Sequence, residues 1–97
     1  MGKVINHEEI IVDDVARSLT QSVYDPGGSG VPASFALIHA EGGQMRYFVN
    51  GQNPTPSSGA LLEDGDIVEL PSIYHIKDFR VVKTGSDSGK ITATYEA

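Results

Sequence analysis

Histidine and acidic residues are the side chains of this chain that could bind a metal ion or carry protons. The three histidines, His7, His39 and His75, lie far apart, and none has a second ligand at the spacing of a metal site. His39 lies in the most apolar segment, so we expect it to be a hydrogen-bonded structural histidine. Asp13-Asp14 and Asp64-Gly65-Asp66 could offer oxygens to calcium, but neither belongs to the spaced ligand series of a calcium loop. The chain has no cysteine, which excludes thiolate ligands, cysteine nucleophiles and disulfides.

The serines and one glycine-rich segment show no pattern of a catalytic or phosphate-binding site. There is no Gly-x-Ser-x-Gly motif, and nothing in the sequence pairs a serine with a histidine. The segment Gly85–Thr92 superficially resembles a phosphate-binding loop, but its glycines are one residue too close, and Ile91 stands where Ser or Thr is needed. A strand is expected to follow it, so no helix N-terminus would face a phosphate. We interpret the segment as a hairpin turn, and we predict no enzyme activity, metal or cofactor.

The composition indicates one acidic globular domain over residues 1–97. The chain has 97 residues, of which 39% are hydrophobic, enough for a single modest core. Seven Lys and Arg against thirteen Asp and Glu give a net charge of −6. This charge argues against unaided binding to nucleic acid or an anionic membrane, and it fits a surface that docks on a basic partner. The N-terminus lacks the apolar region of a signal peptide, so we expect the protein to be made in the cytoplasm.

Short apolar segments separated by turn residues predict an all-β fold. Residues 34–40 are apolar on both faces, as in a central strand covered on both sides, and Gly42-Gly43 would join them to residues 44–49 as a hairpin. Residues 14–24 fit a strand or a helix capped by Asp14, and we prefer the strand because Ser and Thr are frequent there. The remaining strands are expected at residues 9–13, 66–70 with an extension over 73–76, 77–83 and 90–95. Seven or eight short strands predict a single antiparallel β-sandwich or a jelly-roll-like barrel.

Turn residues and aromatic side chains complete this expectation. Asn50-Gly51 and Asp64-Gly65 are pairs that favour turns with positive φ. Residues 1–8 are predicted to form a flexible N-terminal arm, and residues 25–32 a Gly/Pro-rich surface loop. Four aromatic residues have the inward parity of their strands and are expected in the core: Phe35, Phe48, Phe79 and Tyr95. The other three are candidates for a surface or interface: Tyr24, Tyr47 and Tyr74.

An ordered series of features runs from about Ser34 to Tyr95. After the apolar strand come the segments Met45-Arg46-Tyr47-Phe48, Gly51 to Thr55, Gly59-x-Leu61-Leu62-x-x-Gly65-Asp66, Ile76-x-x-Phe79-Arg80-Val81-Val82 and Ile91-Thr92-Ala93-Thr94-Tyr95. This series resembles small structural proteins of tailed bacteriophages and their prophages, in particular capsid decoration (cement) or head-associated protein families. The first thirty residues do not share the pattern.

The resemblance implies a non-enzymatic virion protein. Such a capsid decoration protein would bind the major capsid protein on the outer shell and stabilise it, often as a homotrimer. From the residues themselves we predict that partner contacts lie in the N-terminal segment and in the Gly-rich loop, because the core does not obviously need their apolar or flexible content. The predicted contact residues are Val4, Ile5, Ile10, Val12, Gly28, Val31 and Pro32.

Two alternative functions stay open at this point. A carbohydrate-binding β-sandwich module would use exposed tyrosines such as Tyr47 or Tyr74, and an exposed aromatic cluster would favour it. A phage tail or head–tail connector component would share the resemblance but occur in far fewer copies per particle.

Overall fold

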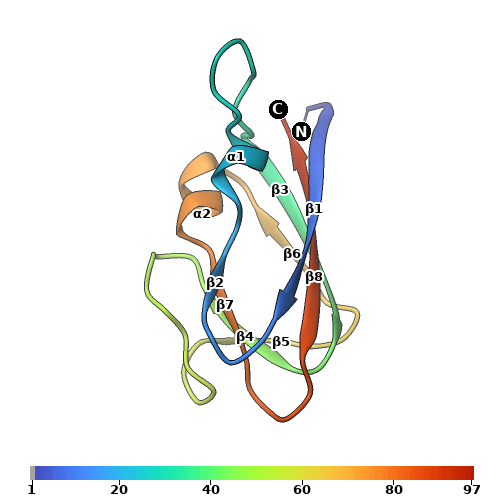
Figure 1. Ribbon diagram of the computed structural model, residues 1–97, viewed down its shortest axis with the longest axis vertical. Helices are drawn as coiled ribbons and strands as arrows, with labels where there is room; N and C mark the ends of the chain where they lie inside the picture. The colour runs from blue at the N-terminus through green and yellow to red at the C-terminus, as the bar shows by residue number, and fades with distance from the viewer. Residues whose placement is uncertain (1) are drawn as a thin grey trace.

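The computed structural model describes residues 2–97 and contains two four-stranded antiparallel sheets that face each other (Figure 1). Sheet A has the strand order β1-β8-β3-β6 and sheet B the order β2-β7-β4-β5. The strands of sheet A are β1 (Val4–Val12), β8 (Gly89–Glu96), β3 (Phe35–Gly42) and β6 (Ile67–Leu70). Those of sheet B are β2 (Arg17–Ser18), β7 (Arg80–Lys83), β4 (Met45–Phe48) and β5 (Ala60–Leu62). Two short helices, α1 (Gln21–Tyr24) and α2 (Ile73–Asp78), complete the fold.

The strand pairing follows one simple rule. Each strand of the first half of the chain pairs with its counterpart in the second half: β1 with β8, β2 with β7, β3 with β6, and β4 with β5. All these pairs are antiparallel, so the chain resembles one long hairpin wrapped around a core. This is the strand order of an eight-stranded jelly roll. The all-β prediction is confirmed. Of the two predicted architectures, a β-sandwich or a jelly-roll-like barrel, the strand pairing is that of the jelly roll.

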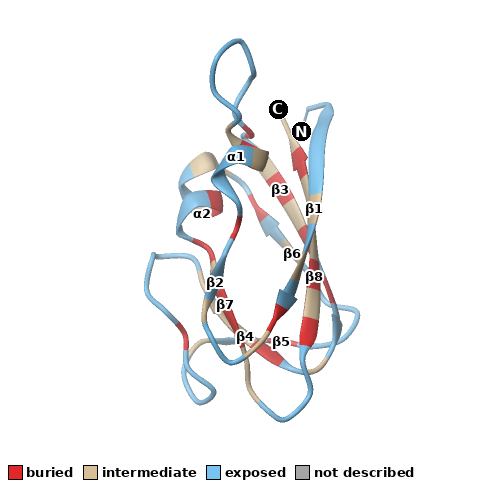
Figure 2. Ribbon diagram, in the orientation of Figure 1, coloured by how far each residue is buried: buried red, intermediate tan, exposed pale blue. Residues whose placement is uncertain are grey.

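The core lies between the two sheets, and the period of two along each strand selects its members (Figure 2). In β8, Ile91, Ala93 and Tyr95 are buried while Thr92 and Thr94 on the other face are not, as the sequence predicted. The two helices add to this core from the ends of the strands. Tyr24 of α1 and Ile76 of α2 are both buried, and the rings of Tyr24 and Tyr95 lie 5.9 Å apart.

The flexible arm predicted for residues 1–8 is wrong from Val4 onward. Strand β1 begins at Val4 and pairs with β8 along its whole length, so the predicted strand at residues 9–13 matches only its second half. The register shifts between Val4 and Asn6, as in a β-bulge. The shift accounts for the adjacent apolar residues Val4 and Ile5 at the start of the strand, whereas Ile11 beyond it is an apolar residue on the exposed outer face.

Two segments expected to be extended contain helices instead. Residues 14–24 hold both the two-residue strand β2 and helix α1, so neither alternative describes the whole segment. The strand predicted over residues 73–76 is wrong, because these residues open helix α2. Ser72 caps this helix, and its Oγ accepts a hydrogen bond from the backbone N–H of His75 at 3.3 Å.

The two hairpins predicted at Gly42-Gly43 and within Gly85–Thr92 do not form, because both segments cross from one sheet to the other. β3 and β4 flank Gly42-Gly43 but belong to different sheets, and so do β7 and β8 on either side of residues 84–88. The two crossings lie against each other, since the N–H of Gly43 donates to the carbonyl of Ser88 at 3.1 Å. Strand β3 is central as predicted, but it is covered on one face only. His39 on the other face is exposed, so the expected structural histidine is wrong.

Candidate functional site

A shallow apolar groove of about 490 Å³ lies where the glycine-rich loop meets the two chain ends. Lys3, Val4, Ile5, Val31 and Ala97 line it. Figure 1 shows this region at the top of the molecule, with the N- and C-terminal segments side by side, to the right of the base of the protruding loop. The lining combines residues from the beginning, the first third and the end of the sequence.

The first strand supplies one wall of the groove. The backbone of Lys3 pairs with that of Ala97 through two hydrogen bonds of 2.9 and 3.0 Å, which extend the β1–β8 pairing beyond Val4. At the register shift, Val4 and Ile5 together stand opposite the single residue Glu96. Because a bulge of this kind re-aims side chains at the rim of a sheet, two consecutive apolar residues can both line the groove.

The glycine-rich loop supplies the other wall. Its base is closed by a 2.8 Å hydrogen bond from the N–H of Ala33 to the carbonyl of Tyr24, whose ring is buried in the core. At its tip, Gly27 and Gly28 have φ of 75° and 58°, a conformation that disfavours other residues. This loop holds Val31 outside the core with 61% of its surface exposed.

The structure brings together three of the seven predicted contact residues, Val4, Ile5 and Val31. Gly28 and Pro32 are exposed in the same loop but do not line the groove. Val12 is fully buried, so the prediction is wrong for it, and Ile10 is partly buried against the core and away from the groove. Both residues follow the bulge, where their parity turns them inward. Lys3 and Ala97 were missed, because only the pairing of the two ends places them at the groove.

Glu8 and Tyr95 form a polar contact on the inner side of β1. The Tyr95 hydroxyl donates a 2.5 Å hydrogen bond to Oε2 of Glu8, and the N–H of Thr20 donates to the same oxygen at 3.0 Å. Burial raises the pKa of Tyr95, and the hydrogen bond to Glu8 raises it further. The phenol therefore stays protonated, and the contact ties the segment before α1 to sheet A.

Ser72 and His75 are paired, contrary to the prediction that no serine has a histidine partner. Oγ of Ser72 lies 2.7 Å from Nδ1 of His75. The same Oγ accepts from the backbone of His75, as expected of a helix cap. A serine nucleophile needs a base that is itself oriented by a third group. Among residues 2–97 no carboxylate is hydrogen-bonded to the His75 ring, so we interpret the pair as a cap of α2.

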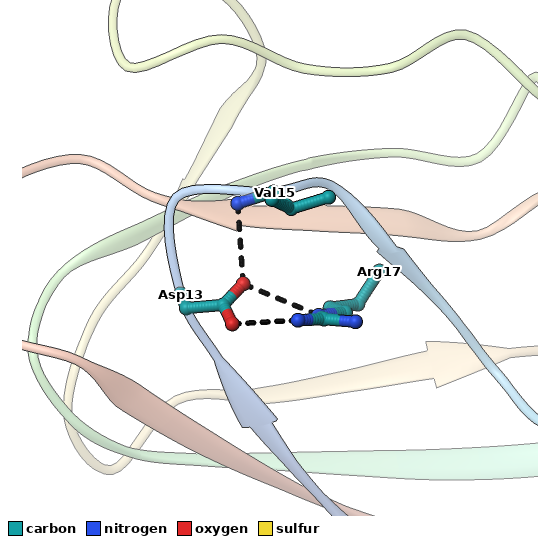
Figure 3. A network of polar contacts seen from close by, with 3 residues as sticks. All are labelled: Asp13, Val15 and Arg17. Carbon is teal, nitrogen blue, oxygen red and sulfur yellow. Dashed lines mark hydrogen bonds and ion pairs between the residues drawn. The ribbon is translucent and has the colours of Figure 1, made fainter.

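The acidic pairs that were considered as calcium ligands stabilise turns through hydrogen bonds to backbone N–H groups. Asp13 forms an ion pair with Arg17, with Oδ2 and Nη2 2.6 Å apart, and its Oδ1 accepts from the N–H of Val15 (Figure 3). The hydrogen bond with Arg17 lowers the pKa of Asp13. Oδ1 of Asp64 accepts from the N–H of Gly42, and Oδ2 of Asp66 accepts from that of Glu63. In the described part of the chain, no three His, Asp or Glu side chains are placed to hold a metal ion.

The candidate sugar-binding tyrosines do not form a common surface. Tyr24 is buried, and Tyr47 packs on Phe79 with ring centroids 5.7 Å apart. Only Tyr74, with 73% of its surface exposed, is open to solvent. Of the four aromatics expected in the core, Phe79 and Tyr95 are fully buried, whereas Phe35 and Phe48 are half-buried.

These features define the molecule as an eight-stranded jelly roll with an apolar groove at one end. Comparisons with protein-family models, curated proteins and solved structures found no match to the chain. Across residues 2–97, neither helix has the length and apolar character needed to cross a membrane.

Proposed function

We propose that this protein is a non-enzymatic binding module that docks on another protein through the groove at the end of the jelly roll. The observation that carries the proposal is the meeting of Val4, Ile5 and Val31 in one exposed apolar surface. Apolar side chains gathered outside the core often mark an interaction site. Here a bulge and an anchored glycine-rich loop hold them there, although neither is needed to complete the core.

We further propose that the partner is the major capsid protein of a tailed bacteriophage, and that the module decorates and stabilises the outer capsid shell. The resemblance of residues 34–95 to phage structural proteins supports this part of the proposal. The net charge of −6 favours a partner surface with basic residues around an apolar contact. The jelly roll alone does not select this function, because viral capsid and lectin domains share the architecture.

The groove would form the centre of a larger contact. A stable protein–protein interface buries about 1,200–2,000 Å² in total. The protruding loop and the first residues of β1 surround the groove and would form its rim. An apolar side chain of the partner would enter between Val31 and Ile5, which excludes water from both.

The test is binding of Val31→Asp to capsids that lack this protein. We expect about a tenfold or greater loss of affinity, because a carboxylate without a partner is costly to bury at an apolar contact. The matched control is Val15→Asp, since Val15 is similarly exposed (58%) but lies at the β1–β2 corner, away from the groove. Equal binding of Val31→Asp and the unmodified protein would overturn the proposed docking site.

The other two candidate functions have less support from the surface. Tyr74 stands alone, whereas a sugar-binding platform uses several exposed rings. The number of copies per particle separates the two phage locations. Copies that cover the shell would support decoration, and a single ring at the portal would support a connector component.

A further inference from the structure

The four edge strands of the two sheets differ greatly in length. β2, β5 and β6 have two, three and four residues, whereas β1 has nine. Pro71 directly follows β6 and limits its extension. An edge strand presents unpaired backbone groups to which another strand can add, and short edges or proline suppress such addition. Among the described residues, β1 is therefore the edge suited to pairing with another chain.

Among residues 2–97, no strand pairs with the second side of β1. In sheet A, β1 is hydrogen-bonded to β8 only. The segment around α1 approaches β1 through inward-facing side chains, since Glu8 accepts from Thr20 and the Asn6 amide donates to the carbonyl of Val23. On the outer face, His7, Glu9 and Ile11 remain exposed, and 61% of the Ile11 surface is accessible.

The sequence of β1 is complementary to itself in part when reversed: Ile5 meets Ile11 and Val4 meets Val12, whereas Asn6 meets Ile10 and Glu8 meets Glu8. Its nine residues, Val-Ile-Asn-His-Glu-Glu-Ile-Ile-Val, are centred on Glu8. Antiparallel pairing of two copies about Glu8 places Ile5 opposite Ile11, and His7 opposite Glu9, twice each. Apolar pairs are favourable cross-strand neighbours, and an imidazole N–H can donate a hydrogen bond to a carboxylate opposite it. Antiparallel pairing of any strand with its own copy gives a two-fold interface, in which residue i meets j while j meets i, so the opposed side chains decide whether the pair is favourable.

We propose that β1 of a second copy of this chain adds to the free edge, so that two A sheets join into one eight-stranded antiparallel sheet. The interface is a two-fold pair, in place of the trimer that the phage resemblance implies. The two Glu8 side chains are directly opposed at the two-fold axis, a like-charge pair that works against this register, and each carboxylate also accepts hydrogen bonds within its own copy. This inference does not depend on the proposed capsid contact.

The first test is the mass of the full chain in solution, measured by sedimentation equilibrium at about 0.15 M salt, where charges beyond about 8 Å are screened. We expect a concentration-dependent species of twice the 10.3 kDa chain mass. Ile11→Lys should raise the dimer dissociation constant about tenfold or more, because it places an unpaired charge opposite Ile5. A monomer at all concentrations, or a trimer, would overturn the proposal.

The matched control is Ile67→Lys on edge strand β6 of the same sheet. Ile67 lies on the same outer face as His39 and is similarly exposed, at 57%. We expect this variant to dimerise like the unmodified protein. A dimer that Ile67→Lys disrupts and Ile11→Lys does not would contradict the assignment to β1.

Cross-linking tests the register and does not rely on the Ile11 variant folding. The chain has no cysteine, so His7→Cys and Glu9→Cys each carry a single thiol. Directly opposed residues of antiparallel strands lie about 4.5–5.5 Å apart at Cα, which is within disulfide range. A mixture of the two variants should form disulfide-linked dimers on mild oxidation, and far more than either variant alone. Equal or no cross-linking in the mixture would overturn the register.

The dimer and the capsid contact can be tested apart. Val31→Asp alters the groove and leaves the central residues of β1 unchanged, so we expect it to dimerise normally. Loss of capsid binding in Val31→Asp with an intact dimer would support both proposals. A failure of dimerisation in the unmodified protein would remove the β1 pairing alone.

Discussion

At the scale of single residues, the contact between Tyr95 and Glu8 joins three parts of the chain that are distant in sequence. Tyr95 belongs to the last strand, Glu8 to the first, and Thr20 precedes α1. The phenol is fully buried, so its hydroxyl needs a hydrogen-bond partner inside the protein. A carboxylate acceptor makes this bond stronger than one between neutral groups.

Removing the Tyr95 hydroxyl should therefore destabilise the fold. For Tyr95→Phe we expect a loss of about 1.5–3 kcal/mol in the free energy of unfolding, the range for hydrogen bonds to charged groups. Urea denaturation measures it. The control is Tyr47→Phe, because Tyr47 is half-buried and its hydroxyl has no hydrogen-bond partner among the described residues. Equal stability of the two variants would show that the Glu8 contact contributes nothing.

The same residue predicts an alkaline dependence of stability. Its pKa is raised in the folded state, so the folded protein holds a proton that the unfolded chain releases above the ordinary value of 10.0. The stability that the raised pKa of Tyr95 contributes is thus complete below pH 10.0 and falls as the pH rises further. Unfolding free energies measured across this range should fall more steeply for the unmodified protein than for Tyr95→Phe. Parallel curves would contradict the raised pKa.

At the scale of elements, α2 shows how a cap overrides a strand-like pattern. Ile73-Tyr74-His75-Ile76 has residues common in strands, but Ser72 offers an oxygen to the first turn of a helix. The helix then buries Ile76 in the core. In β1, the register shift breaks the alternation at Val4 and Ile5, and exposed Ile11 breaks it again beyond the shift.

The cap of α2 can be tested by its side chain. Ser72→Ala should lower the free energy of unfolding by about 0.5–2 kcal/mol, because the first turn of α2 loses its acceptor. Ser72→Asp retains an acceptor of the same reach and should stay close to the unmodified protein. If both variants lost the same stability, the role of Ser72 would lie in its contact with His75 instead of the cap.

At the scale of the whole molecule, the two chain crossings between the sheets must fit against each other. A Cβ built on Gly43 would lie 2.3 Å from the carbonyl oxygen of Asp87, whereas one on Gly85 would meet nothing within 4 Å. Neither glycine has positive φ, so the difference between them is one of space and not of backbone conformation. The close approach holds together the end of the sandwich opposite the groove.

Gly43→Ala should therefore destabilise the protein, by about 1–3 kcal/mol as in other overpacked sites. Gly85→Ala, in the facing loop, should be neutral or slightly stabilising, because it only restricts the unfolded chain. Thermal unfolding of the two variants gives the comparison. A neutral Gly43→Ala would mean that the crossings do not depend on this contact.

The sequence by itself determined the β character of the chain and the places where it turns. These features depend on neighbouring residues: the alternation in Lys90–Tyr95, and the glycines of Asn50-Gly51 and Asp64-Gly65, whose φ values of 82° and 89° require glycine. Strand β5 was not predicted, because three residues are too few to show the alternation of a strand.

Only the tertiary structure decided which sheet each strand joins, and with it the groove and the free edge. The pairing of β1 with β8 joins residues almost a full chain length apart, and no local pattern records such a choice. That pairing buries Val12, turns Val4 and Ile5 outward at the register shift and brings Ala97 beside Lys3. The candidate contact surface is thus a product of long-range pairing, while its individual apolar residues were visible in the sequence.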